Sequence, residues 1–330
     1  MISVNKWLKF ILSLAISALG LYYAFGQVNF DELWFHLKSV NIYWMSLAIL
    51  LLVFSVAIRA ERWQMLLEPI ENIRFHPLFG ATMVGYFGNS VLPFRLGELL
   101  RAYTISEDNR VETSAAFGTI ILERILDLLG LVVTIILFGW FFPFDSGGRT
   151  IMIGVVVMTL LGFGFIIVLG STRSHLMDRI EKWAIFEKPF AHRLLTILNS
   201  LLDGLTSIRA TKHVGQIVIH TIFLWVVYYS ITYTVILASG ISLSWIEVGV
   251  VLISTSLAVA IPAAPGAVGT YHAAAVYVLT ALFFVGSSES QAFAILLHAV
   301  GFIPLIIIGF VYFLKSSVHI RDISNQHIVE

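Results

Sequence analysis

The chain contains no cysteine among its 330 residues. It can therefore form no disulfide, has no thiolate nucleophile and offers no cysteine ligand to a metal ion. The phosphate-loop motif G-x-x-x-x-G-K-[ST] is absent too, as are H-E-x-x-H and G-x-S-x-G. These absences argue against a P-loop ATPase, a zincin-type protease and an α/β-hydrolase. We expect no metal, no cofactor and no enzymatic activity.

Charge is also scarce. Asp, Glu, Lys and Arg make up 12% of the chain, whereas 58% of residues are hydrophobic and the mean hydropathy is +0.90. A soluble domain has about 25% charged residues. The formal net charge is zero, and we expect no nucleic-acid partner. The composition predicts an all-α integral membrane protein with a single transmembrane domain over residues 1–330.

Six apolar runs approach or exceed the roughly 20 residues that cross a bilayer. They are Trp7–Phe25, Ile42–Ile58, Ser114–Phe142, Thr150–Gly170, Gln216–Ser239 and Gln291–Leu314. The first is interpreted as an uncleaved anchor, because Tyr22 and Tyr23 occupy the place of a signal-peptide cleavage site.

Proline and glycine interrupt two further apolar regions, 77–100 and 245–286. The residues expected to break them are Pro93, Gly97, Pro262, Pro265, Gly266 and Gly269. Non-helical backbone at membrane depth is tolerated where protein shields it. Both regions are therefore predicted to be re-entrant hairpins.

The cations predict the orientation. With six spans and two hairpins, seventeen Lys and Arg residues fall on one side, including Arg59 and Arg62. Lys38 and Arg149 fall on the other side, and Arg124 lies within the membrane. The positive-inside rule then places both termini in the cytoplasm. We expect a multi-pass protein of the cell (inner, cytoplasmic) membrane.

The same topology predicts an inverted repeat. Units 42–142 and 216–314 have the same order of span, hairpin and span, but they run in opposite directions. Pro93-x-x-x-Gly97 in the first hairpin matches Pro265-x-x-x-Gly269 in the second. Interrupted segments at corresponding positions are typical of the central site of a transporter.

Three charged residues lie inside the run 114–142: Glu123, Arg124 and Asp127. A charge at mid-bilayer costs about 3 to more than 10 kcal/mol, so it needs a partner or a wet cavity. Two interpretations stay open. The group is either an ion pair that fixes helix packing, or a polar site for a charged substrate or a proton.

The first hairpin adds Arg95, Glu98 and Arg101, at spacings of three residues. If a helix begins near Leu96, they lie at its N-terminal end, where free N–H groups favour anions. Two arginines there would suit a phosphate or a carboxylate. The alternative is a basic cluster that touches lipid headgroups without specificity.

The second hairpin has no formal charge but offers Tyr271 and His272. His272 could bond a headgroup or carry a proton; the alternative is a histidine that only satisfies a helix contact. His220 and His298 are open to the same two interpretations.

Residues 171–212 form the largest cytoplasmic stretch. A stripe from Leu194 to Ile208 has the 4-3-4-3 spacing of an amphipathic helix, and Pro189 separates it from a shorter helix with Leu176 and Ile180. We expect these helices at the membrane interface or docked on the spans.

The runs GNSVLPFRLGELLRAY, ERILDLLGL and PAAPGAVGTYHAA resemble the lysylphosphatidylglycerol synthase transmembrane-region family, the flippase-like domain proteins. The resemblance covers about residues 7–315. It implies movement of a lipid between leaflets, without the soluble aminoacyl-transferase domain of the best-known members. The family commonly has Gly-Gly before an acidic residue; here Ala267 follows Gly266, and His272 stands about where the acid would be.

We therefore expect a lipid translocase (flippase) whose partners are membrane lipids with an anionic phosphate headgroup; a homo-oligomer is left open. The alternatives are a non-transporting accessory protein with a structural polar core and, less favoured, an intramembrane lipid-modifying enzyme. The expected substrate-binding residues are Arg95, Glu98, Arg101, Glu123, Arg124, Asp127, Tyr271 and His272.

Overall fold

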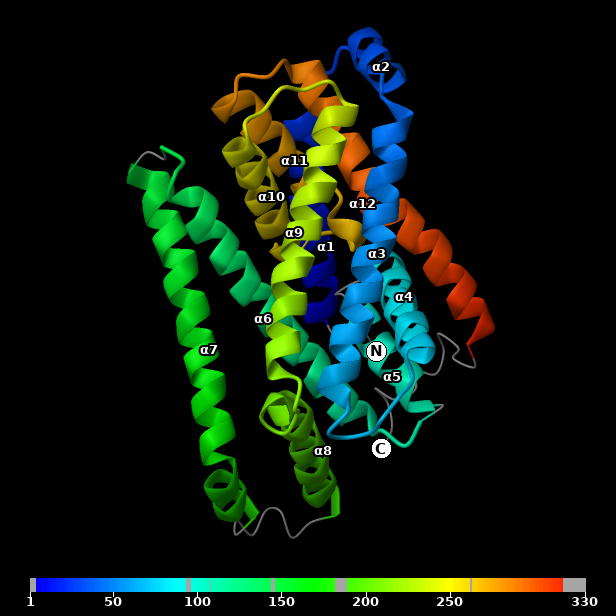
Figure 1. The fold of residues 1–330 in the computed structure, drawn as a ribbon, viewed down its shortest axis with the longest axis vertical. Helices are drawn as coiled ribbons and strands as arrows, with labels where there is room; N and C mark the ends of the chain where they lie inside the picture. Colours follow the sequence, from blue (N-terminus) through cyan, green and yellow to red (C-terminus); the bar gives the residue numbers. More distant parts are fainter. Residues whose placement is uncertain are drawn as a thin grey trace.

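A computed structural model describes residues 4–92, 96–107, 109–143, 146–181, 189–261 and 263–316, and every regular element in these ranges is helical (Figure 1). The longer helices are α1 (Val4–Phe25), α3 (Ile42–Leu67), α6 (Thr113–Gly139), α7 (Ser146–Glu181), α8 (Pro189–Thr206), α9 (Val214–Ala238) and α12 (Ser287–Lys315). The shorter ones are α2 (Phe30–Lys38), α4 (Phe75–Val91), α5 (Gly97–Glu107), α10 (Trp245–Ala260) and α11 (Thr270–Tyr277), with single turns η3 (Ser207–Arg209), η4 (Pro265–Ala267) and η5 (Val278–Leu282).

Four helices are long and apolar enough to cross a membrane: α3, the first part of α7, α9 and α12. A fifth span results if α1 and α2, which meet at 87°, count as one bent element. Helix α6 has 27 residues but carries three central charges, so its composition does not meet the same criterion. The all-helical, multi-pass membrane class is confirmed. The division into six spans and two re-entrant hairpins stays a prediction.

Three helix assignments differ from the sequence prediction. Helix α3 continues past Ile58 to Leu67, so Arg59 and Arg62 lie within it. Helix α7 runs to Glu181 without a break, so Leu176 and Ile180 belong to its end and form no separate helix. Helix α2 was not predicted, because its nine residues lie between the first two predicted spans. Asn29 caps α2 by accepting backbone N–H bonds from Asp31 and Glu32.

Both interrupted regions are helix pairs separated by a break. In the first, α5 begins at Gly97, as expected, and lies against α4. Pro93 and Pro262, which were predicted to break the two regions, and Arg95, which was predicted to bind substrate, lie outside the described residues. In the second region, residues 261–269, which include η4, separate α10 from α11.

The second break is held from outside by α1. The hydroxyl of Ser17 accepts the N–H of Ala264 at 2.7 Å. Gly269 has φ +95°, and a Cβ added there would lie 2.2 Å from the carbonyl oxygen of Ser17. Only glycine combines that left-handed backbone with such a close approach. The break therefore depends on a contact with a helix almost 250 residues earlier in the chain.

Two packing arrangements position the site described below. The largest core cluster joins residues of α3, α9, α10, α11 and α12, and Figure 1 shows α3 and α9 lying side by side through the centre. Helix α8 docks on α6, where Gly204 faces the backbone of Ala115. Leu205, from the predicted amphipathic stripe of α8, is buried there with Leu122 of α6.

The α8–α6 contact yields a stability prediction. A Cβ at Gly204 would lie 2.0 Å from the Ala115 carbonyl oxygen, so Gly204→Ala forces the backbones apart. We expect a loss of about 1–3 kcal/mol in unfolding free energy, measured as a lower midpoint of thermal unfolding in detergent. Gly154→Ala in α7 is the control, since a Cβ there meets nothing within 4 Å. An equal midpoint for both variants would contradict the tight docking of α8.

Candidate functional site

Seven charged side chains from three helices meet inside the protein. Helix α3 supplies two arginines, α5 supplies one carboxylate and one arginine, and α6 supplies two carboxylates and one arginine. They are Arg59, Arg62, Glu98, Arg101, Glu123, Arg124 and Asp127. These residues are called the charge cluster below. On α3, Arg59 and Arg62 are three residues apart and so share a helix face, as do Arg124 and Asp127 on α6.

Asp127 lies at the centre of the charge cluster. Its Oδ2 accepts a hydrogen bond from Arg59 at 2.8 Å, and its Oδ1 accepts one from Arg62 at 2.6 Å. A longer contact of 3.4 Å joins Oδ2 to Arg124. Short charge-assisted hydrogen bonds of this kind are about twice as strong as neutral ones. One carboxylate thus pairs with two arginines of α3 and joins that helix to α6.

Glu123 occupies the driest part of the charge cluster. Its side chain is 0% exposed, and its carboxylate oxygens lie 2.6 Å from Arg101 and 3.6 Å from Arg62. The guanidinium of Arg101 also lies over the ring of Trp63, 3.7 Å from its centroid. Such stacking supplies cation–π attraction where water is excluded. Arg101, Arg62 and Glu123 therefore form a buried, water-poor end.

The opposite end is more accessible. Nε of Arg124 lies 2.9 Å from Glu98, and these side chains are 38% and 21% exposed. Both residues line a small space beside Tyr86 and Asn89, with a volume of about 10 Å³. That is about the volume needed for one water molecule. Arg124 thus contacts both Glu98 and Asp127, and the charge cluster is nearly closed in this structure.

Neutral partners from α9 complete the set. Tyr228 accepts a hydrogen bond from Arg59 at 2.7 Å, and Thr221 accepts one from Arg62 at 3.0 Å. Nη2 of Arg101 is buried with no hydrogen-bond partner among the described residues. With four arginines against three carboxylates, the cluster has a formal charge of +1. Counted over the described residues, it therefore has one uncompensated positive charge and at least one buried donor free for an anion.

The sequence analysis missed two members of this group. It placed Arg59 and Arg62 in a cytoplasmic loop, but they are 4% and 0% exposed and belong to the charge cluster. Their spacing could have revealed them: Arg59 and Arg62 directly follow the predicted span 42–58 and are three residues apart, as are Arg124 and Asp127. Arg95, the remaining predicted arginine, lies outside the described residues.

The predicted residues of the second break form a separate group. The rings of His272 and His298 lie 4.5 Å apart, and Tyr271 packs on His298 at 5.4 Å. Nε2 of His298 lies 2.9 Å from the carbonyl oxygen of Gly266, so it is the donor. His298, a histidine of lower rank in the sequence analysis, thus fixes the break from α12. Tyr271 and His272 belong to this aromatic group, whereas the ion pairs belong to the charge cluster.

Fold and site together define a class: a multi-pass, all-helical membrane protein with a buried group of ion pairs beside an interrupted helix. Residues 10–309 match the sequence family described as the lysylphosphatidylglycerol synthase TM region, and the chain belongs to that family.

Three similar proteins come from archaea. The glycosyltransferase AglD of Haloferax volcanii is 25% identical over 296 residues, which cover 77% of this chain and 46% of AglD. A UPF0104 membrane protein of Methanocaldococcus jannaschii is 24% identical over 69% of this chain and 93% of its own length. Another UPF0104 membrane protein, from Methanothermobacter thermautotrophicus, is 24% identical over 71% of this chain and 74% of its own length. The chain thus spans about half the length of AglD but most of the two shorter proteins.

The geometry predicts unequal roles for the carboxylates. Asp127→Asn leaves Arg59 buried with no ion-pair partner among the described residues and Arg62 with only its 3.6 Å contact to Glu123, and breaking such a buried pair costs about 3–5 kcal/mol. We expect a large fall in the yield of monodisperse protein on size-exclusion chromatography. Glu98→Gln, at the accessible end, is the matched control and should retain most of the yield. Equal yields from the two variants would contradict the central role of Asp127.

The structure also identifies the compensating partner for Arg124. Because Asp127 is shared with two other arginines, Asp127→Asn cannot restore the balance of an Arg124→Ala variant. Glu98→Gln can, since the Arg124–Glu98 contact is the accessible pair. We expect the double variant Arg124→Ala/Glu98→Gln to fold at least as well as Arg124→Ala, judged by yield and unfolding midpoint. A lower yield for the double variant would show that Glu98 has another partner of greater weight.

Proposed function

We propose that this protein is a lipid translocase of the cytoplasmic membrane, with both termini in the cytoplasm and no catalytic step of its own. Its substrate is a lipid with an anionic phosphate headgroup. The observation that carries the proposal is the excess positive charge of the buried cluster, next to an interrupted helix. The family and the UPF0104 membrane relatives are consistent with this role.

The charge cluster has the chemistry of a phosphate site. Guanidinium groups bind phosphate oxygens with paired hydrogen bonds, and a helix N-terminus adds unpaired N–H groups. Glu98 lies in the first turn of α5, so Arg124, its ion-pair partner, reaches that helix end. A phosphate that displaced Glu98 would find Arg124 and the free Nη2 of Arg101. Arg95, on the preceding segment, is proposed to join them.

An inverted repeat is part of the proposal, and the helix order supports it. Each of the series α3–α4–α5–α6 and α9–α10–α11–α12 consists of a long helix, two short ones and a long one. The contacts correspond as well: α3 packs on α9, while α12 packs on α4 and α6 packs on α10. Helix α4 of the first series also contacts η4 of the second. Transporters bind substrates between such halves.

The small space beside Glu98 and Arg124 distinguishes what a transport role and a structural role each require. A volume for about one water molecule admits no headgroup, so transport requires a second conformation in which the charge cluster opens. A structural role needs no such opening, and the dense ion pairs around Asp127 favour that second candidate: an accessory protein with a rigid polar core. The two candidates differ in what happens at the accessible end of the cluster.

We expect substitutions of Arg124 to reduce lipid transport more than they reduce protein stability. We expect Arg124→Ala/Glu98→Gln to fold but to lose most lipid movement in proteoliposomes, measured by chemical quenching of a tail-labelled phosphatidic acid. Arg124→Lys should also lose activity, because an ammonium cannot reproduce the paired hydrogen bonds of a guanidinium. Full transport by the well-folded double variant would end the substrate role and favour the accessory protein. A new covalent lipid product would identify an enzyme instead.

The proposed orientation can be tested by labelling, since the chain has no cysteine of its own. A single cysteine at Gly147 should react with an impermeant reagent only from outside the cell. A cysteine at Lys212 should react only after the cytoplasmic side is opened. Labelling of residue 147 from the cytoplasmic side alone would contradict the topology.

A further inference from the structure

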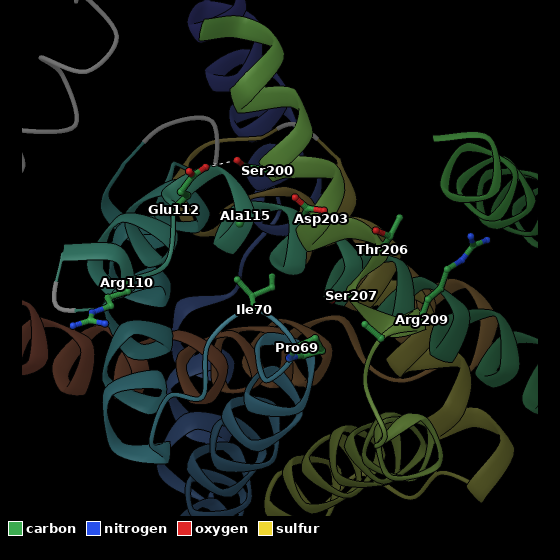
Figure 2. Close-up of a pocket in the computed structure, with 11 residues that line it drawn as sticks. Pro69, Ile70, Arg110, Glu112, Ala115, Ser200, Asp203, Thr206, Ser207 and Arg209 are labelled. Atoms are coloured by element: carbon green, nitrogen blue, oxygen red, sulfur yellow. Dashed lines mark hydrogen bonds between the residues drawn. The ribbon is translucent and has the colours of Figure 1, made fainter. Parts of the chain in front are cut away.

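A second cavity lies apart from the charge cluster, at the end of the molecule where α6 begins. It has a volume of about 600 Å³ and lies between α8, η3, the start of α6 and the loop after α3. This is within the 300–1,000 Å³ typical of small-ligand sites. Figure 2 shows Glu112, Ser200 and Asp203 along one wall, with Arg110 and Arg209 at opposite ends and directed away from the middle.

One face of α8 and η3 supplies most of the polar wall. Ser200, Asp203 and Ser207 follow at spacings of three and four residues, which places them on one side of the helix. The hydroxyl of Ser200 donates to Glu112, the residue that precedes α6. The middle of the cavity therefore presents hydroxyls and carboxylates, while Ile70 and Ala115 supply apolar surface.

Ser207 points to a missing partner. It is only 3% exposed, and its Oγ is buried with no hydrogen-bond partner among the described residues. A buried polar group without a partner costs free energy, so native structures nearly always supply one. Ser207 lines the cavity. A ligand with hydroxyl groups in the cavity would supply both the donor and the acceptor that this side chain lacks.

The charged side chains that line the cavity restrict the kinds of ligand that it can bind. Among the described lining residues, two arginines (Arg110 and Arg209) and two carboxylates (Glu112 and Asp203) give a formal charge of zero, so the lining provides no excess positive charge for an anion. Carboxylates accept hydrogen bonds from neighbouring hydroxyls, and serine can both donate and accept. This chemistry suits an uncharged polyol or sugar. A phosphate is better served by the charge cluster, which has a formal charge of +1.

We infer that this cavity is an entry site for the sugar or polyol part of a lipid headgroup whose phosphate is later held by the charge cluster. The inference rests on the proposed function and names its substrate class. Glu112 and Arg124 are twelve residues apart on α6, which is about 18 Å along the helix. A single sugar phosphate does not bridge that length, so the headgroup occupies the two sites in turn.

A binding measurement tests this inference independently of lipid transport. Tail-labelled phosphatidylinositol carries a polyol and a phosphate, whereas labelled phosphatidic acid carries only the phosphate. We expect the purified full-length protein in detergent to bind phosphatidylinositol more tightly, as measured by fluorescence anisotropy. Ser207→Ala should weaken that binding about fivefold, the value of one hydrogen bond, and leave phosphatidic acid unchanged. Its unfolding midpoint should not fall, because the hydroxyl has no partner to lose.

A matched control is present in the chain. Ser290 in α12 is also fully buried with an unpartnered Oγ, but it does not line the cavity. Ser290→Ala should leave both affinities unchanged. Asp203→Asn is a second variant and should weaken phosphatidylinositol binding in the same direction as Ser207→Ala.

Equal affinity of the wild type for both lipids would overturn the inference, and so would unchanged phosphatidylinositol binding in Ser207→Ala. Tighter binding of labelled phosphatidylethanolamine would also overturn it, in favour of an ammonium group at Asp203. If phosphatidic acid is still translocated in an Arg124-dependent way, the failure concerns this cavity alone. If binding holds and no lipid is moved, the entry site stands and the proposed transport fails.

Discussion

The carboxylate of Asp127 is the constraint on which the arrangement of the central helices depends. Each of its oxygens takes a guanidinium from α3, at 2.8 and 2.6 Å. The same two arginines reach Tyr228 and Thr221 of α9, so one side chain sets the relation of α6 to both neighbours. Removing one partner of a buried ion pair costs far more than the pair contributes in net stability, because the remaining charge stays dehydrated. The group is therefore a strict constraint on helix register, whatever its value to overall stability.

The side chains of the charge cluster differ in solvent exposure, and this difference distinguishes a structural end from an end that could bind a ligand. Glu123, Arg62 and Arg101 are almost completely buried, whereas Arg124 is 38% exposed and Glu98 21%. Coulomb interactions strengthen as water is excluded, so the buried end resists rearrangement. At the accessible end water can replace a lost contact, and the exchange of Glu98 for a phosphate costs less. The same network can therefore fix helix packing at one end and bind a headgroup at the other, which reconciles the two interpretations left open by the sequence.

Hydropathy and local spacing predicted most of the helices, because apolar length and breaks by proline or glycine are local properties. They also indicated that Arg124 needs a partner or a wet cavity, because an isolated charge within the membrane is costly. They failed at Arg59 and Arg62, since the positive-inside rule assigns any cation beyond a span to a loop and contains no information on whether the helix continues. The Ser17–Ala264 and His298–Gly266 contacts could not be predicted either, because they join distant segments. The entry cavity depends likewise on the docking of α8 on α6.

The two halves differ in how firmly their interrupted segments are held, and this bears on the proposed transport cycle. The first half contains α5, which is tied to α6 through the ion pairs of Arg101 and Glu98. The second break has no charged residue; a hydroxyl from α1 and an imidazole from α12 hold its backbone. A neutral hydrogen bond contributes about 0.5–1.5 kcal/mol net, much less than breaking a buried ion pair costs. Moving η4 and its flanking residues therefore costs less than separating α5 from α6.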